Sequence, residues 1–428
     1  MARNMKDSGI EWIGEIPEGW EIKRLGAILQ ERNEVNNPIQ TTSILSLTNN
    51  RGVIPYSEKG NQGNKAKDDL TGYKIAHIGD IVLNSMNVII GSVGLSNYYG
   101  AVSPVYYMLF PRNNIETNIQ YYNYLFQTTA FQQSLRGYGN GILEIRMRIQ
   151  MQKLKTVLLP VPTFLEQSNI TVYLDASLSK LNILLSKTRS SIEEYKKLKQ
   201  AVITQAVTKG VRGEQEMKDS GVEWIGEIPK DWEIKRLKSF CTIVDCKNRT
   251  PDVFPDGKYT VVRTTCIKDC SFSYEGSYQT DTTNFKAWTL KGQPHKGDIF
   301  FTREAPVGEA CLVPNADNLC MGQRVMFFRP EDNSDARYIM YSIYGPLVRE
   351  YIASKNSGST VGHLKLGQVA CIPIFYCPPL EQKEIADYLD AKCAEIDRLI
   401  AKKEQLVKEL EGYKKSLIYE VVTGKRKV

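Results

Sequence analysis

The chain contains the same segment twice, and this repeat constrains its architecture more than any other feature of the sequence. Residues 5–25 and 217–237 are identical at 18 of 21 positions, with an offset of 212 residues. A second, weaker repeat relates residues 165–208 to residues 380–423 with an offset of 215. Two copies are too few for a solenoid. We therefore expect two similar halves within one polypeptide, related by approximate twofold symmetry.

Each half ends in a heptad pattern of apolar residues, which predicts a helix of about 40 residues, roughly 60 Å long. Thr163 and Glu166 form a capping-box sequence before the first helix, and Pro379 occupies the first position of the second. Gly210 and Gly424 mark the predicted ends. The residues expected to pack between the helices are Leu174, Leu181, Leu184, Tyr195, Leu198, Leu389, Ile396, Leu399, Leu406, Leu410 and Tyr413.

A heptad helix pairs either with a second copy of the chain or with another helix of the same chain. A homodimeric coiled coil is therefore one interpretation. The internal duplication favours pairing within the chain. A twofold relation between the repeats makes the two helices antiparallel and sends the intervening blocks to opposite ends.

The blocks between the repeats, residues 26–158 and 238–371, share a weak common pattern. In each, a His-X-Gly-Asp turn leads into an apolar strand, then into a strand that ends at Pro111 or Pro330 and a tyrosine-rich helix. We predict an α+β fold in which two globular α+β domains are held apart by two long antiparallel helices in a coiled coil, with a pseudo-twofold internal repeat. The expected domains are 1–158 (arm and first globular domain), 159–213 (first spacer helix), 214–371 (second arm and globular domain) and 372–428 (second spacer helix and basic tail).

Polar and basic residues gather at the predicted strand tips and in the late loops of both blocks. Arg, Asn, Ser and Thr side chains read base edges or hold phosphates, and loops on a rigid scaffold suit a recognition surface. Taken singly, each residue is also explained as an ordinary solvated side chain. The candidate DNA-binding residues are Asn84, Ser85, Asn87, Arg136, Tyr138, Asn140, Arg146, Arg148, Thr302, Arg303, Lys355, Asn356, Ser359, Thr360, His363 and Lys365.

The composition indicates a globular protein. The net charge of +7, from 55 basic and 48 acidic residues, is compatible with a polyanionic partner without requiring one. All nine cysteines lie in the second half without a CxxC pair, and the three histidines are isolated, so we expect neither a disulfide framework nor a metal site. The sequence shows no apolar run long enough for a membrane span and no signal region, so we expect a cytoplasmic location.

Motifs that carry catalysis are missing from the sequence. It contains no Walker A loop, HExxH or GxSxG pattern. The segment PDVFPDGKY at 251–259 is compatible with a nuclease carboxylate set, but a turn rich in Pro, Asp and Gly is the commoner structure. We therefore expect no catalytic residue in this chain.

Several motifs together resemble the specificity subunit of type I restriction-modification enzymes. They are the two arms of the form DSGIEWIGEIPEGWE, the helix starts PTFLEQSNI (162–170) and PPLEQKEIADYLD (378–390), and the helix ends AVTKG and VVTGK. The resemblance covers the whole chain. It implies that the globular blocks are target recognition domains, each reading one half of a split, asymmetric DNA target.

The resemblance also implies partners and cofactors. The paired helices would act as a ruler and dock two modification subunits, which bind S-adenosylmethionine and methylate adenine. Restriction subunits would join for DNA cleavage that depends on ATP and Mg²⁺. The repeated arms would pack Trp12, Trp20, Trp224 and Trp232 against the helix ends, so that both halves offer equivalent platforms to identical partners. Plain core packing is the alternative role of these tryptophans.

Two other functions are compatible with the sequence. A methyltransferase or nuclease fused to its own recognition domain would need a catalytic domain, and no stretch of the chain is left to supply one. An orphan DNA-binding protein or regulator of the same fold, without active partner subunits, would have the same sequence features.

Overall fold

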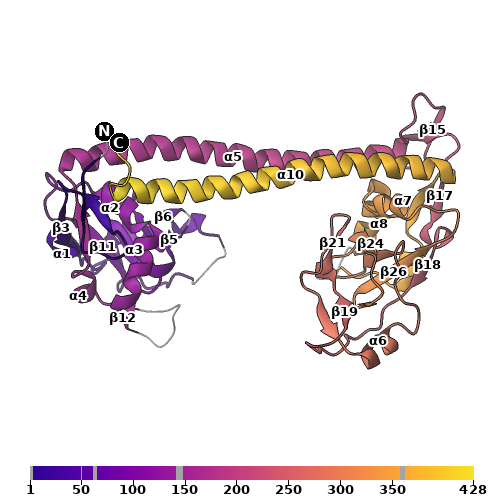
Figure 1. Ribbon diagram of the computed structural model, residues 1–428, viewed down its shortest axis with the longest axis horizontal. Helices are drawn as coiled ribbons and strands as arrows, with labels where there is room; N and C mark the ends of the chain where they lie inside the picture. Colours follow the sequence, from indigo (N-terminus) through magenta and orange to yellow (C-terminus); the bar gives the residue numbers. More distant parts are fainter. Residues whose placement is uncertain (1–2, 50, 61–64, 141–147, 357–361) are drawn as a thin grey trace. The chain divides into compact units, whose positions relative to one another are not determined.

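The chain folds into two compact units, and each unit combines one globular domain with a segment of each of two long helices. The first unit comprises residues 1–189 and 405–428, and the second comprises residues 190–404. The long helices are α5 (Phe164–Lys209) and α10 (Pro379–Val422), so the division passes through both (Figure 1). The computed structural model describes residues 3–49, 51–60, 65–140, 148–356 and 362–428.

A four-stranded antiparallel sheet forms the centre of the first domain. Alternate residues of its strands face two different clusters, because successive side chains of a strand point to opposite faces. On β11, Tyr107 and Leu109 join the core that also contains the helices, whereas Met108 joins a second cluster on the other face. The strand order is β4 (Leu29–Arg32), β11 (Tyr106–Pro111), β8 (Ile81–Asn84) and β9 (Val93–Leu95).

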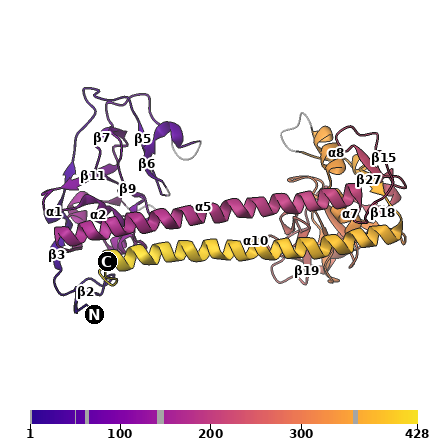
Figure 2. The ribbon, with the colours of Figure 1, turned by 90° about the horizontal axis from the view of Figure 1, so that it is seen from above.

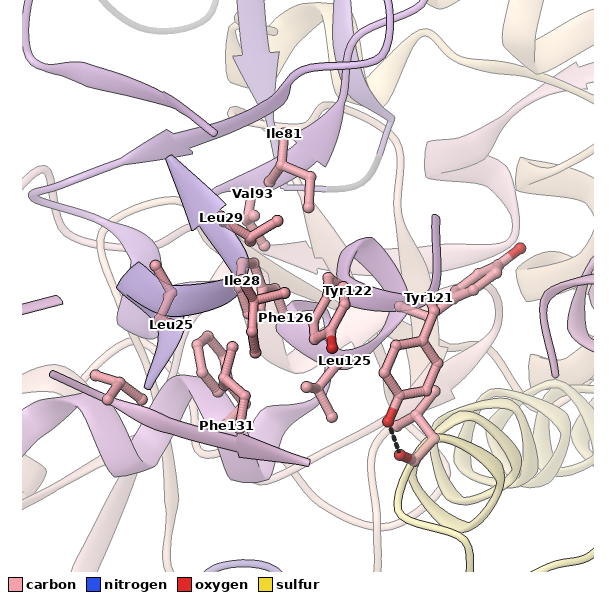
Figure 3. Close-up of a cluster of buried hydrophobic side chains, with 14 of the residues drawn as sticks. Leu25, Ile28, Leu29, Ile81, Val93, Tyr121, Tyr122, Leu125, Phe126 and Phe131 are labelled. Carbon is pink, nitrogen blue, oxygen red and sulfur yellow. Dashed lines mark hydrogen bonds between the residues drawn. The ribbon is translucent and has the colours of Figure 1, made fainter. Parts of the chain in front are cut away.

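Aromatic side chains fill the core between this sheet and the helices of the first unit. Figure 3 shows Tyr121, Tyr122 and Phe126 of α2 (Ile119–Phe126) beside Phe131 of α3 (Thr129–Ser134). The rings of Phe126 and Phe131 stack with their centroids 4.5 Å apart. The remaining strand pairs are β1 (Met5–Asp7) with β2 (Glu15–Pro17), β3 (Glu21–Arg24) with β14 (Leu158–Val161), β5 (Leu45–Thr48) with β6 (Gly52–Pro55), β7 (Lys74–Ala76) with β10 (Gly100–Val102), and β12 (Gly139–Asn140) with β13 (Arg148–Ile149).

The second domain repeats the central sheet. The strands β18 (Cys241–Val244), β26 (Val325–Pro330), β23 (Ile299–Thr302) and β24 (Ala310–Leu312) lie in the same order and are all antiparallel. The arm hairpin β15 (Met217–Asp219) and β16 (Glu227–Pro229) and the pair β17 (Glu233–Arg236) and β27 (Pro373–Tyr376) also recur. The helices are α6 (Thr282–Trp288), α7 (Ala336–Ile343), α8 (Pro346–Asn356) and α9 (Leu366–Ala370).

The sheet that lies outside this shared plan differs between the domains. In the second domain, β22 (Tyr278–Thr280), β19 (Tyr259–Val262) and β25 (Leu319–Met321) form a mixed three-stranded sheet in which β19 and β25 are parallel. In the first domain, the corresponding part of the chain forms the two-stranded pairs β5–β6 and β7–β10. The predicted α+β class and internal repeat are confirmed.

The same turn enters the central sheet in both domains. Asp80 accepts hydrogen bonds from the backbone N–H of His77 and from Arg32, and Asp298 accepts equivalent bonds from His295 and Arg329. Gly79 and Gly297 adopt positive φ angles of 87° and 97°, which explains the glycine in each turn. The arginine that pairs with the aspartate is Arg32 of β4 in the first domain and Arg329 of β26 in the second. The ion pair therefore recurs although the arginine lies on a different strand.

Within each unit, α5 and α10 run antiparallel (Figures 1 and 2). In the first unit, Asn182 contacts Lys414 and Arg189 pairs with Glu411. In the second unit, Lys199 pairs with Asp397, and Arg212, just beyond the end of α5, pairs with Glu384. Along these pairs the residue numbers rise on α5 while they fall on α10, as expected for antiparallel helices. The predicted pairing of the two helices within one chain is therefore observed in each unit.

The packing stripe of the helices differs from the predicted heptad in one of its two rows. Leu174, Leu389 and Ile396 are buried, and Leu181, Tyr195, Leu399 and Leu410 are half-buried. Four predicted positions are wrong, because Leu184, Leu198, Leu406 and Tyr413 are 45%, 47%, 40% and 47% exposed. The second buried row lies four residues after the first rather than three, and it includes Leu178, Leu185, Ile192, Ala386, Cys393 and Val421. Both choices place apolar residues on the helix, and the row that is buried also packs into the cores of the globular domains, as Leu178, Val421 and Cys393 do.

The two arms have nearly identical sequences but different surroundings. Trp20 and Trp232 are fully buried against the ends of the helices, close to Gly424 and Gly210 respectively. Trp12 packs edge-on against Phe131 in the first unit. Trp224, the matching residue of the second arm, is 52% exposed. The expected packing against helix ends therefore holds for Trp20 and Trp232, and the surroundings of Trp12 and Trp224 differ.

Candidate nucleic-acid interface

The polar residues predicted at the tip of β8 stabilise the fold of the first domain. Ser85 is fully buried, and its Oγ donates a hydrogen bond to the carbonyl of Val105 at 2.8 Å. Asn84 is buried, and its Oδ1 accepts from the backbone N–H of Met86 at 3.0 Å. Asn87 is half-buried and precedes the short turn η2 (Val88–Ile90). Asn84 and Ser85 are therefore not part of an exposed surface.

The equivalent residues of the second domain are also buried. Thr302 Oγ1 donates to the carbonyl of Pro306 at 2.6 Å and accepts from the backbone N–H of Glu309 at 2.9 Å. Arg303 pairs with Asp245 at 3.0 Å and donates to Oδ1 of exposed Asn248 at 3.0 Å. A buried guanidinium needs such partners to offset its lost hydration. Thr302 and Arg303 thus organise the surface behind Asn248, and direct base contact is not available to them in this arrangement.

The late loop of the first domain places basic side chains in solvent. Arg136 and Arg148 are exposed, and Tyr138 is half-buried. Asn140 lies at the end of β12. Arg146 lies outside the described residues. Arg136 and Arg148 therefore remain candidates for contact with DNA.

The late loop of the second domain brings several charged residues together. Nδ1 of His363 lies 2.6 Å from Oε1 of Glu304, and Arg324 pairs with the same carboxylate at 3.0 Å. Lys355 and Lys365 are exposed, and Asn356 ends α8. Ser359 and Thr360 lie outside the described residues. Glu304, Arg324 and His363 form a polar cluster next to the buried Arg303.

A basic and aromatic cluster on the second domain was missed by the sequence analysis. The Lys247 ammonium lies 4.7 Å and the Arg249 guanidinium 5.5 Å from the ring centroid of Trp288 on α6. The indole Nε1 donates a hydrogen bond to the carbonyl of Arg249 at 3.1 Å. Cation–π contacts of this kind hold the two cations in place. The signal was the pair of basic residues in CKNRTP, but their partner lies 39 residues further along the chain.

A groove of about 1600 Å³, lined by both polar and apolar side chains, lies in the first unit between the globular domain and the helix pair. Its lining includes Arg51, Arg189, Lys414 and Lys415 together with the amides of Gln120, Gln127 and Asn182. Burial lowers the pKa of Lys414, which donates to Asn182 at 2.8 Å. Arg51 and Arg189 are paired with Glu58 and Glu411, so the groove is not strongly cationic.

The arrangement as a whole suits binding. The described residues include no group of three or more His, Cys, Asp or Glu side chains placed to hold a metal ion. Among them, no helix combines the length and the apolar character that crossing a lipid bilayer requires. Exposed arginine, lysine and asparagine side chains on both domains are the chemistry that contacts phosphates and base edges.

Comparison with known proteins identifies a family. The family described as type I restriction modification DNA specificity domain matches residues 17–194 and 229–409, one match in each half of the chain. A putative type I restriction enzyme MjaX specificity subunit from Methanocaldococcus jannaschii is 26% identical, over 97% of this chain and 96% of the relative. The type I restriction enzyme MjaVIII specificity subunit of the same organism is 24% identical, over 96% and 94% of the two chains.

Solved structures show the same fold. One chain, from a study of complex assembly and conformational transition of the type I R-M system, aligns with a TM-score of 0.72 at 15% identity, over 96% of this chain and 99% of its own length. The crystal structure of the HsdS subunit from Thermoanaerobacter tengcongensis aligns with a TM-score of 0.51 at 15% identity, over 96% and 98% of the two chains.

Proposed function

Because the chain belongs to the family of type I restriction modification DNA specificity domains, we propose that each of its two globular domains reads one half of a bipartite, asymmetric DNA target. The chain is a DNA-recognition subunit of a type I restriction-modification system. One observation supports the bipartite target above the others. The two domains share a central sheet but carry different additional sheets and different exposed side chains, so the bases that they contact should differ.

The partners of the proposed complex follow from this function. Two modification subunits, carrying S-adenosylmethionine, would dock on the chain and methylate adenine within the target. Restriction subunits, using ATP and Mg²⁺, would join them for cleavage in the cytoplasm. The chain itself would contribute recognition and no catalytic residue. Its candidates for DNA contact are the exposed Arg136, Arg148, Asn248 and Arg249, together with the half-buried Lys247.

An orphan DNA-binding protein of the same fold is the second candidate function. It would bind the same kind of target, but no modification subunit would act with it. The charged and amide-bearing surfaces of both domains are compatible with this function as well, because they support binding alone.

The decisive experiment is methylation by the reconstituted complex. We expect the purified chain to bind no S-adenosylmethionine, and the chain with two modification subunits to methylate adenine in one particular split sequence. Sequencing of the methylated genome of a host that expresses all the genes identifies that sequence. Methylation by the chain alone would show a fused enzyme. DNA binding without methylation in the presence of the partners would favour the orphan protein.

A further inference from the structure

The loop at residues 251–257 of the second domain exposes two apolar side chains to solvent. Hydrogen bonds to neighbouring elements fix its backbone. Val253 is 62% exposed and Phe254 is 42% exposed. Exposed apolar residues are ordinary when they are isolated, but two adjacent ones on a rigid loop gain nothing for folding. A nuclease carboxylate set and a turn are both compatible with the sequence of this segment, and its residues 255–256 form a turn.

Four hydrogen bonds fix the loop on its support, and a fifth closes the turn within the loop. The N–H of Phe254 donates to the carbonyl of Gln279 at 2.9 Å, and the N–H of Gly257 donates to the carbonyl of Phe254 at 2.8 Å. Hydroxyl groups of the neighbouring strand β22 hold the other side, since Tyr278 donates to the carbonyl of Pro251 and Thr280 to that of Asp252, both at 2.8 Å. The N–H of Asp252 reaches Oδ1 of Asn284 on α6 at 3.4 Å.

The packing of Gly257 and of the sheet below makes this support stiff. A Cβ atom on Gly257 would lie 2.2 Å from the carbonyl oxygen of Thr280, so the loop backbone is pressed directly against β22. Under the loop, the ring of Tyr259 stacks on Phe285 of α6 at 3.9 Å between centroids. Burial raises the pKa of Tyr278 to about 12, so its hydroxyl stays protonated and donates at physiological pH. A loop held in this way loses little entropy when it binds.

Two positively charged side chains next to the loop indicate that its binding partner is DNA. Lys247 and Arg249 make cation–π contacts with Trp288 of α6, and α6 also holds the loop through Asn284. Neither cation has an ion pair among the described residues. Figure 1 shows α6 and β19 at the end of this unit farthest from α5 and α10. Two unpaired cations beside a rigid apolar tip match a phosphate backbone beside stacked bases. Asp252 and Asp256 flank the tip, and a carboxylate accepts from the N4 amino group of cytosine in the groove.

We propose that the loop 251–257 is a wedge that inserts Phe254, supported by Val253, against or between base pairs of the second half-site, while Lys247 and Arg249 hold the adjacent phosphates. The inference rests on the proposed function and adds to it a distortion of the DNA at one base step. Apolar side chains inserted in this way partly unstack the step and make recognition depend on its deformability.

The test uses the complete complex, without S-adenosylmethionine, and duplexes with 2-aminopurine placed in turn at each position of the second half-site. For the wild-type complex, we expect a rise in fluorescence at one base step. In Phe254→Ala, this rise should disappear and binding should weaken by about tenfold. Ile115→Ala, at an exposed apolar residue of the first domain that belongs to no proposed binding surface, is the matched control and should change neither quantity.

The outcomes separate this inference from the proposed function. Lys247→Ala and Arg249→Ala should each lower the slope of log affinity against log salt by about one, without changing the fluorescent position. A Phe254→Ala complex that binds and unstacks DNA like the wild type would overturn the wedge and leave the proposed function intact. Normal DNA binding with weaker retention of the modification subunits would overturn it in favour of a protein contact. A wild-type complex that neither binds nor methylates DNA would overturn both.

Discussion

At the scale of single residues, Tyr121 shows how a domain is tied to a helix end. Its hydroxyl is fully buried and donates to the carbonyl of Val422 at 2.8 Å, a bond drawn in Figure 3. Val422 is the last residue of α10, where backbone carbonyls have no partner within the helix. The tyrosine therefore satisfies a buried acceptor that the helix itself cannot satisfy.

We expect Tyr121→Phe to destabilise the first unit by about 1–3 kcal/mol, because it leaves the Val422 carbonyl buried without a donor. The measurement is the free energy of unfolding from urea denaturation of the full chain. Tyr98→Phe, at a side chain that is 40% exposed, is the control and should change stability by less than about 0.5 kcal/mol. Equal stability of Tyr121→Phe and wild type would mean that water replaces the hydroxyl.

At the scale of elements, the two long helices depend on a stripe with spacings of four and three residues. In α5 the buried positions of the first unit include Leu174, Leu178 and Leu185. In α10 they include Leu417 and Val421. Leu184 carries the same side chain as Leu174 but is 45% exposed, whereas Leu174 is fully buried. Substituting Leu174 and Leu184 in turn therefore separates the effect of burial on stability from the effect of residue type.

Leu174→Ala should cost about 2–5 kcal/mol of unfolding free energy, because it removes a fully buried side chain and leaves a cavity. Leu184→Ala should cost less than about 1 kcal/mol, since its side chain is 45% exposed and alanine is the better helix former. Both values come from denaturant unfolding followed by circular dichroism. Similar losses from the two substitutions would contradict the observed packing row.

At the scale of the whole molecule, one chain carries the same plan twice with different details. The central sheets have the same strand order, and the same Asp–Arg turn enters each. The additional sheets differ, and so does the exposure of the two arm tryptophans Trp12 and Trp224. A shared frame with divergent surfaces is the arrangement expected of one protein that recognises two unlike half-sites.

Deleting residues 188–194 of α5 together with 403–409 of α10 removes one heptad from each helix in register. One heptad is about 10 Å of helix, which corresponds to about three base pairs of DNA. We therefore expect the preferred spacer between the half-sites to shorten by about three base pairs, while the half-site sequences stay the same. Methylome sequencing of cells that express the variant measures both. An unchanged spacer would contradict a ruler role for the helices.

Local sequence was enough for much of the architecture. The Gly-Asp turns, the capping residues of the long helices and the apolar runs that end at Pro111 and Pro330 predicted the turns, the helix bounds and the strands β8, β11, β23 and β26. The candidate interface was predicted less well. Ser85 and Thr302 looked exposed because polar residues at a strand tip usually are, but neighbouring backbone groups bury them and use their hydroxyls.

The sequence by itself determined the duplicated plan, the two long helices and the α+β class, because these follow from repeats and periodicities that are written along the chain. Only the tertiary structure decided which row of each helix is buried, which tip residues are covered and where Lys247, Arg249 and Trp288 meet. The physical reason is that burial and cation–π contacts depend on residues distant in sequence, whose approach is set by the packing of whole elements.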